Sequence, residues 1–190
     1  ETISHFKKAG IQLALLTNGS SESQNKKIER FGLAPLFSYI FIEEPVLPDL
    51  PQSYARLRAA CPITIAGGEL EYTRWGAKML MDMEAIDVYQ MDPIMAGGIS
   101  EVNKICTLAS AYDVQVIPHG GSVPVNAQIS FAQNSVVTPM MECLVAWQKI
   151  AQFFLKNPVK PVNGFITPPT APGVGLELDE SKIESEREIN

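Results

Sequence analysis

Apolar and polar positions along this chain follow two alternating patterns. Short apolar runs rich in β-branched residues predict six strands, at 11–16, 38–42, 63–66, 87–91, 114–117 and 136–141. Between and after them, apolar residues at helical spacing predict helices at 21–31, 52–60, 72–81, 100–112 and 147–155, with a less regular pattern at 123–132. A strand recurs about every 25 residues, close to the length of one βα unit. We therefore expect an α/β fold built on a parallel sheet.

Parallel βα units build either an open, doubly wound sheet or a closed barrel. A closed (β/α)8 barrel needs eight units in roughly 250 residues, whereas this chain has 190 residues and shows six units. We expect the C-terminal part of such a TIM-type barrel, incomplete by about two strands. The chain then divides into a first βα segment (1–42), further barrel units (43–157), and a Pro-rich return segment with a charged tail (158–190).

Composition narrows the class of protein but does not select a function. The net charge of -6 and the pI near 5.0 give no basic surface for nucleic acid or an anionic membrane. Three widely spaced cysteines form no CxxC pair, so we expect reduced thiols and a cytoplasmic location. No apolar run approaches the roughly 18 residues that span a bilayer.

Polar residues stand at the ends of successive predicted strands. In chain order they are Thr17, Glu43, Glu69, Asp92, His119 and Glu142, at intervals of 26, 26, 23, 27 and 23 residues. A parallel barrel places all such positions on its C-terminal rim, where barrel active sites are built. One carboxylate there could simply cap a helix. Five ionisable residues in phase with the repeat predict a shared site instead.

The residue types at this rim suit metal and acid–base chemistry. Glu43 and Glu69 offer the hard oxygen ligands that Mg²⁺ prefers. Asp92 could orient the imidazole of His119 and raise its basicity. Glu142 could bind a substrate oxygen. We therefore expect Glu43 and Glu69 as metal ligands, and His119, Asp92 and Glu142 as catalytic residues.

Five short motifs containing these residues occur in order along the chain. They are FIEEP at 41–45, GGE at 67–69, QMDP at 90–93 followed by GG at 97–98, PHG at 118–120, and PGVGLEL at 172–178. Together they resemble the mandelate racemase-like branch of the enolase superfamily, over about residues 41–190. The resemblance implies Mg²⁺ as cofactor, held by Glu43 and Glu69, an Asp92–His119 dyad, and Glu142 as the glutamate of the final strand.

Within that superfamily, the surroundings of His119 are most similar to acid-sugar dehydratases of the rhamnonate or galactonate type. This implies a carbon–oxygen lyase whose substrate is a small carboxylate, a sugar acid, with His119 as base for the α-proton and acid for the departing 3-hydroxyl. A homo-oligomer is compatible with the resemblance. A racemase or epimerase would need a second base, and the usual lysine is not visible in this chain.

Residues 6–40 depart from this pattern and resemble a second family, the haloacid dehalogenase-like hydrolases. The matching words are KAG at 8–10, LTNGSS at 16–21 and KIERFGL at 27–33. Thr17 would match the phosphate-binding Ser/Thr of that family, but its nucleophilic aspartate and acidic metal pair are not found. On the enolase-type alignment, Leu16 stands where the third metal carboxylate is expected, and leucine cannot ligate Mg²⁺.

Three hypotheses follow from this mixture. The first is a Mg²⁺-dependent sugar-acid dehydratase of weak or no activity in this chain. The second is a chimeric or truncated half-barrel without chemistry. The third is a fragment of a haloacid dehalogenase-like phosphatase.

Overall fold

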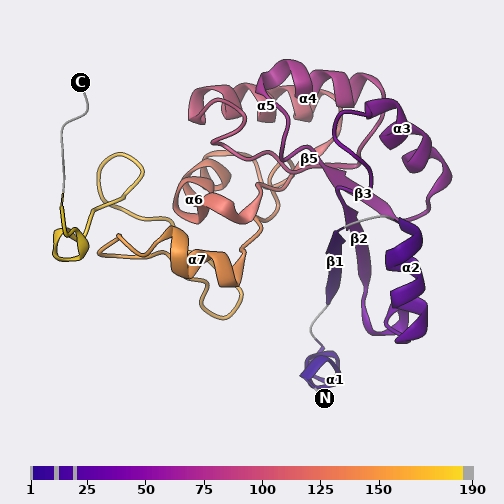
Figure 1. Cartoon of the computed structure of the whole chain (residues 1–190), viewed down its shortest axis with the longest axis horizontal. Helices are drawn as coiled ribbons and strands as arrows, with labels where there is room; N and C mark the ends of the chain where they lie inside the picture. The colour runs from indigo at the N-terminus through magenta and orange to yellow at the C-terminus, as the bar shows by residue number, and fades with distance from the viewer. Residues whose placement is uncertain (1, 11–12, 19–20, 186–190) are drawn as a thin grey trace.

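The sheet of this protein is parallel and sequential. The computed structural model describes residues 2–10, 13–18 and 21–185. Within them five strands pair in the order β1-β2-β3-β4-β5 (Figure 1). Their bounds are Ala14–Asn18, Tyr39–Glu43, Thr64–Gly67, Val88–Tyr89 and Gln115–Val116. Every neighbouring pair is parallel. The order never reverses, as it would in a doubly wound sheet, so the sheet is part of a barrel wall.

Helices join the strands and form an arc outside them (Figure 1). The helices that follow β1 to β5 are α2 Ser21–Arg30, α3 Pro51–Ala60, α4 Thr73–Asp82, α5 Ile99–Ala111 and α6 Val123–Ala132. They confirm the predicted helices to within two residues at each end. The helix α7, Val145–Ala151, is shorter than predicted, and α1, Thr2–Lys8, was not predicted. Strands inside and helices outside are the arrangement of the C-terminal part of a (β/α)8 barrel.

The core lies between the sheet and the helices α4 and α5. On α4, Ala77, Leu80 and Met81 are buried at the i, i+3, i+4 spacing of one helix face. They pack in one cluster with strand residues such as Ile65 and Tyr89, both fully buried. Burying a side chain of this size contributes about 1.5–3 kcal/mol. The helical periodicity of the sequence is thus the direct cause of this packing.

The sixth predicted strand is wrong. Residues 136–141 run beside β5 but form turns and irregular chain rather than a strand. Only two backbone hydrogen bonds tie them to the β5 segment, from Val116 N–H to Val137 O at 2.7 Å and from Glu142 N–H to Pro118 O at 3.1 Å. Pro118 and Pro139 have no N–H to donate, so a regular ladder cannot form between them. The segment still brings Glu142 to the rim.

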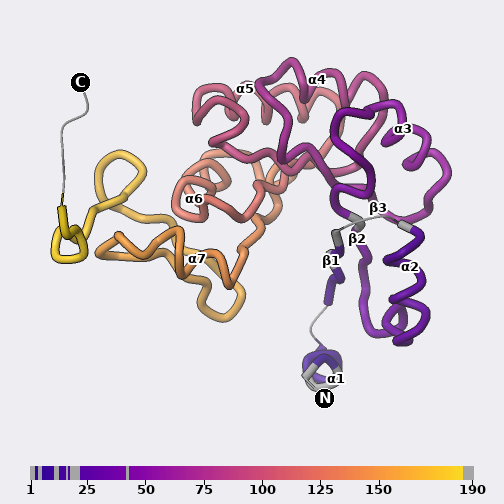
Figure 2. Tube along the Cα trace, in the orientation of Figure 1, coloured from indigo at the N-terminus to yellow at the C-terminus, as the bar shows by residue number. Residues whose placement is uncertain are grey.

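The chain after α7 forms loops rather than sheet (Figure 2). The Pro-rich segment holds no regular helix or strand, as predicted, and a short 3-10 turn follows at Glu180–Lys182. Two other such turns are Ala34–Leu36 and Gly120–Ser122. No helix of the described residues is long and apolar enough to cross a membrane.

Gly68 joins β3 to the rim in a conformation and space that only glycine fits. Its φ is +104°, and an added Cβ would lie 2.4 Å from the ring of Tyr89. Gly98 has a similar φ of +89° but nothing within 4 Å of an added Cβ. We expect Gly68→Ala to lower the free energy of unfolding by about 1–3 kcal/mol more than Gly98→Ala, because only Gly68→Ala adds overlap to backbone strain. Urea unfolding of the two variants measures the difference, and equal losses would contradict the overlap.

Candidate active site at the carboxyl ends of the strands

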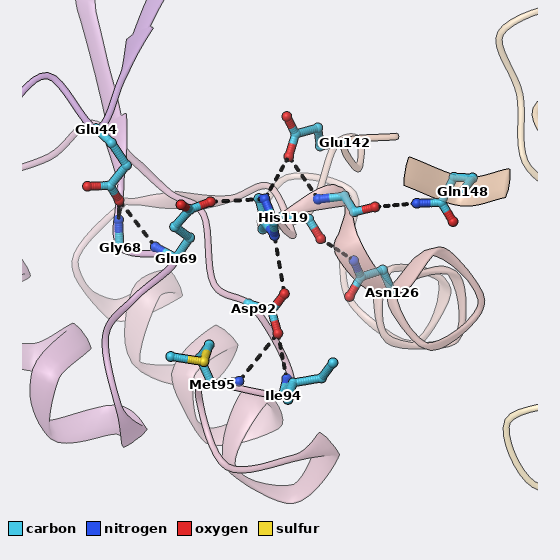
Figure 3. Close-up of polar contacts among 11 residues, drawn as sticks. Glu44, Gly68, Glu69, Asp92, Ile94, Met95, His119, Asn126, Glu142 and Gln148 are labelled. Atoms are coloured by element: carbon cyan, nitrogen blue, oxygen red, sulfur yellow. Dashed lines mark hydrogen bonds and ion pairs between the residues drawn. The ribbon is translucent and has the colours of Figure 1, made fainter. Parts of the chain in front are cut away.

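His119 lies at the centre of a group of carboxylates (Figure 3). Its Nε2 atom is 2.9 Å from Glu69 Oε2 and 3.9 Å from Glu142 Oε2, and its Nδ1 atom is 3.2 Å from Asp92 Oδ2. Both ring nitrogens therefore face carboxylate oxygens, which accept but do not donate hydrogen bonds when ionised. The imidazole satisfies both only when it carries both protons. The structure thus brings three of the other four predicted site residues, Glu69, Asp92 and Glu142, around the ring of His119.

The backbone at the end of the sheet sets the position of His119. Ile117 N–H donates to Tyr89 O and His119 N–H donates to Met91 O, both at 3.0 Å. These bonds continue the parallel pairing of β4 with β5 beyond the strands themselves. The ends of two neighbouring strands therefore place Asp92 and His119 side by side, since Asp92 follows Met91 directly.

Asp92 is held from two sides. Its Oδ1 atom accepts the N–H groups of Ile94 at 2.7 Å and of Met95 at 3.3 Å, while Oδ2 faces the imidazole of His119. Burial alone would raise the pKa of Asp92, but the hydrogen bonds from His119 and the two N–H groups outweigh it, so the pKa is lowered. Asp92 is thus an ionised carboxylate fixed against Nδ1.

Amide side chains from two helices hold the turn that carries His119. Asn126 Nδ2 on α6 donates to the carbonyl oxygen of His119, and Gln148 Nε2 on α7 donates to that of Gly120, both at 2.5 Å. Glu142 Oε2 accepts the N–H of Gly120 at 2.8 Å. Neither Asn126 nor Gln148 was predicted as a site residue. Asn126 is fully buried within an apolar helix, and a lone amide in such a helix was the available signal.

The same carboxylates change the pKa of the imidazole. Hydrogen bonds to Asp92 and then to Glu69 raise the pKa of His119 to about 10, against the opposing effect of burial. The negative charges of Glu69 and Glu142 add to the increase. Without a further cation at the site, His119 is therefore an imidazolium at neutral pH, the acid form of the pair.

Glu43 is buried beside this group without a partner for one of its oxygens. Its side chain is 7% exposed, and Oε1 makes no hydrogen bond. Burial and the negative charges of Glu142 and Glu69 raise the pKa of Glu43 to about 7. A buried, unpartnered carboxylate oxygen is costly, and a proton or a metal cation would relieve it.

The donor set fits Mg²⁺ in chemistry, because Glu43 and Glu69 supply hard carboxylate oxygens and Glu43 Oε1 lacks a partner. Among the described residues, however, no group of three His, Cys, Asp or Glu is arranged to hold a metal ion. Glu69 is instead turned toward His119. The side chain of Leu16, at the expected third position, lies outside what the structure describes. Thr17 donates its hydroxyl to Gln24 at 2.9 Å.

Comparison with known proteins identifies relatives of this chain. The family described as "Enolase C-terminal domain-like" matches residues 16–182. The D-galactarolactone cycloisomerase of Agrobacterium fabrum (strain C58 / ATCC 33970) is 34% identical over 157 residues, which are 77% of this chain and 42% of that protein.

Two solved structures also match closely. The 3,6-anhydro-D-galactonate cycloisomerase of Zobellia galactanivorans has 28% identity and a TM-score of 0.72, over 95% of this chain and 60% of that one. A Mesorhizobium loti protein provisionally described as a dehydratase has 27% identity and a TM-score of 0.73, over 96% and 50%. The chain thus spans about half the length of these relatives.

These matches bear on the segment that resembled a hydrolase. The family match takes in residues 16–40, and the Zobellia structure covers 95% of the chain. One family therefore accounts for residues 16–40 of this segment together with the following chain up to residue 182. The hypotheses of a chimera and of a haloacid dehalogenase-like segment find no support.

The hydrogen bonds of His119 to Asp92 and then to Glu69 predict a strongly raised pKa of the imidazole. We expect the pKa of His119 to be about 10 and to fall toward its ordinary value of 6.5 in Glu69→Gln. The ion pairs of His119 then stabilise the fold fully below pH 6.5, and this contribution is lost as pH rises through about 10. Nuclear magnetic resonance titration of the imidazole in metal-free protein measures this, and a pKa near 6.5 in the wild-type chain would refute it.

Proposed function

The chain belongs to the enolase C-terminal domain-like family, and from that premise we propose that it carries the acid–base and metal-binding groups of a Mg²⁺-dependent enzyme that acts on a sugar acid. The observation that carries the proposal is the imidazole of His119 held between Asp92 and Glu69, at 3.2 and 2.9 Å. The names of two relatives, a D-galactarolactone and a 3,6-anhydro-D-galactonate cycloisomerase, support small sugar-derived acids and their lactones as the substrate class.

Dehydration is the reaction that we propose for this site. His119, once it has lost a proton from Nε2, takes the α-proton of the substrate and forms an enolate. The same nitrogen then returns a proton to the 3-hydroxyl as the carbon–oxygen bond breaks, and water leaves. The resulting enol rearranges to a 2-keto acid. Asp92 accepts a hydrogen bond from the Nδ1–H group throughout, and so keeps the ring in one orientation.

Two carboxylates would hold the metal in this scheme. Glu43 and Glu69 are the proposed ligands, because Glu43 has an unpartnered buried oxygen and its pKa of about 7 reflects burial and then the charges of Glu142 and Glu69. Family members typically use Mg²⁺, which when bound stabilises the charge that develops on the substrate carboxylate. Glu142, already bonded to Gly120 N–H, would contact a substrate hydroxyl.

A non-catalytic half-barrel is the second candidate, and the sequence at Leu16 favours it. Leucine stands where the third metal carboxylate is expected, so two ligands must suffice for the ion. Mg²⁺ usually completes its octahedral shell with water and substrate oxygens, which makes weak binding compatible with the first candidate. We therefore expect low activity from this chain.

Substitution of Glu43 tests the metal proposal. We expect Glu43→Gln to weaken Mg²⁺ binding at least about tenfold, because the amide supplies one neutral oxygen in place of a charged carboxylate. Isothermal titration calorimetry with MgCl₂ gives the dissociation constant. Glu84→Gln is the matched control, since the Glu84 side chain is 87% exposed and pairs only with Arg58, at 3.6 Å, among the described ion pairs. Equal affinity of the two variants would contradict Glu43 as a ligand.

Exchange of the α-proton tests the acid–base proposal even where dehydration is slow. In D₂O with Mg²⁺, we expect deuterium to enter the α-position of D-galactonate or L-rhamnonate, and His119→Asn to slow this at least about 100-fold. Proton magnetic resonance of the recovered acid measures the exchange. No exchange by the wild-type chain would favour the non-catalytic half-barrel. Rapid dehydration would instead show that Leu16 does not limit activity.

A further inference from the structure

Glu44, the residue after Glu43 at the end of β2, binds the neighbouring strand rather than the site (Figure 3). Its Oε1 atom accepts the N–H of Gly68 at 2.7 Å and the N–H of Glu69 at 3.3 Å. Its own N–H donates to Ala66 O at 3.1 Å. One residue of β2 thus ties down the chain that leads from β3 to Glu69.

Tyr54 holds the other side of this carboxylate. It lies in α3, is 2% exposed, and donates its hydroxyl to Glu44 Oε2. Burial, and then the hydrogen bond to Glu44, raise the pKa of Tyr54 far above its ordinary range, so the hydroxyl remains a donor. An added Cβ at Gly67 would lie 3.1 Å from the Tyr54 ring. The ring therefore lies directly against the turn that Glu44 binds.

The backbone of Glu44 shows that this arrangement is imposed by its contacts. Its φ is +43°, in the left-handed region that residues with a Cβ seldom occupy. Such a conformation persists only where surrounding interactions fix it. Here the fixing interactions are the bonds to Tyr54, Gly68 and Glu69.

We propose that Glu44 and Tyr54 are positioning residues that act through Glu69. The strand β3 ends before Gly68 and is paired with β4, whereas the chain from Gly68 to Glu69 lies beyond the strand, where hydrogen bonds to another element can restrain it and so aim the Glu69 side chain. Glu44 supplies that restraint at the N–H of Gly68 and of Glu69 itself, and Glu69 Oε2 then lies 2.9 Å from His119 Nε2. The catalytic consequence rests on the proposed function, whereas the geometric part does not.

The first test reads the geometry in metal-free protein at pH 7. The Nε2 proton of His119, shielded by Glu69, should give a slowly exchanging downfield proton signal in a ¹⁵N-edited spectrum. We expect this signal to be lost in Glu44→Ala and Tyr54→Phe and kept in Glu44→Gln, whose amide oxygen still accepts the N–H groups of Gly68 and Glu69. Tyr54→Phe removes one hydroxyl only, and so provides an answer if Glu44→Ala does not fold.

Glu101→Ala is the matched control for a purely structural effect. Glu101 also accepts a backbone N–H from another unit of the fold, that of Arg74 at 3.0 Å, but it belongs to α5, and its described ion pairs are with Arg74 and Lys104 rather than with His119. We expect Glu101→Ala to lower stability and to leave the His119 signal in place. Loss of the signal in Glu101→Ala as well would overturn the specific role of Glu44.

The second test asks whether Glu44 acts through Glu69 on Mg²⁺. We expect Glu44→Ala to weaken Mg²⁺ binding about tenfold in the wild-type background, and to have no further effect in Glu69→Gln. A retained proton signal together with an unchanged dissociation constant would overturn the proposal, as would equal losses in both backgrounds. If the wild-type chain binds no Mg²⁺ but Glu44→Ala still loses the signal, the positioning role stands and the metal proposal fails.

Discussion

A balance of charge around one imidazole governs the rim of this protein. Among the described contacts, His119 is the cationic partner that Glu69, Asp92 and Glu142 share. These carboxylates and the nearby Glu43 would repel one another in a partly buried setting, and the imidazolium offsets only part of that repulsion. The imidazole is held among these carboxylates by the strand pairing, by the turn after β5 and by the amide side chains of two helices.

Much of the fold could be predicted from local pattern, because the 25-residue alternation of strands and helices depends on neighbours in the chain. The failures have physical causes. Residues 136–141 have the composition of a strand, but Pro118 and Pro139 remove the donors that a ladder needs. For residues 16–40, short words such as LTNGSS suggested a second ancestry, whereas one family covers the segment. Short motifs of this kind match by chance more easily than a βα repeat that continues along the chain.

Which residues lie together at the candidate site could be predicted from the sequence, but the bonds between them could not. Strand-end spacing identified His119, Asp92, Glu69 and Glu142, since parallel strands end at one edge. Spacing could not show that Glu69 faces the imidazole, or that Glu44 bonds Gly68. It also could not find Asn126, whose part in the turn depends on the carbonyl oxygen that α6 meets. Such contacts depend on tertiary geometry, which the position of a residue along the chain does not determine.

The amide side chains that hold the His119 turn have a consequence for how the sequence of such a protein can evolve. Asn126 and Gln148 donate to main-chain oxygens of this turn from the helices α6 and α7, so part of the restraint on the ring comes from helices. Leu47 and Ile94, which follow β2 and β4, project exposed side chains, and these side chains make none of the described bonds to the ring. On the proposed function, such side chains could be exchanged to admit a different acid while the bonds that hold His119 are kept, which separates the choice of substrate from the chemistry performed on it.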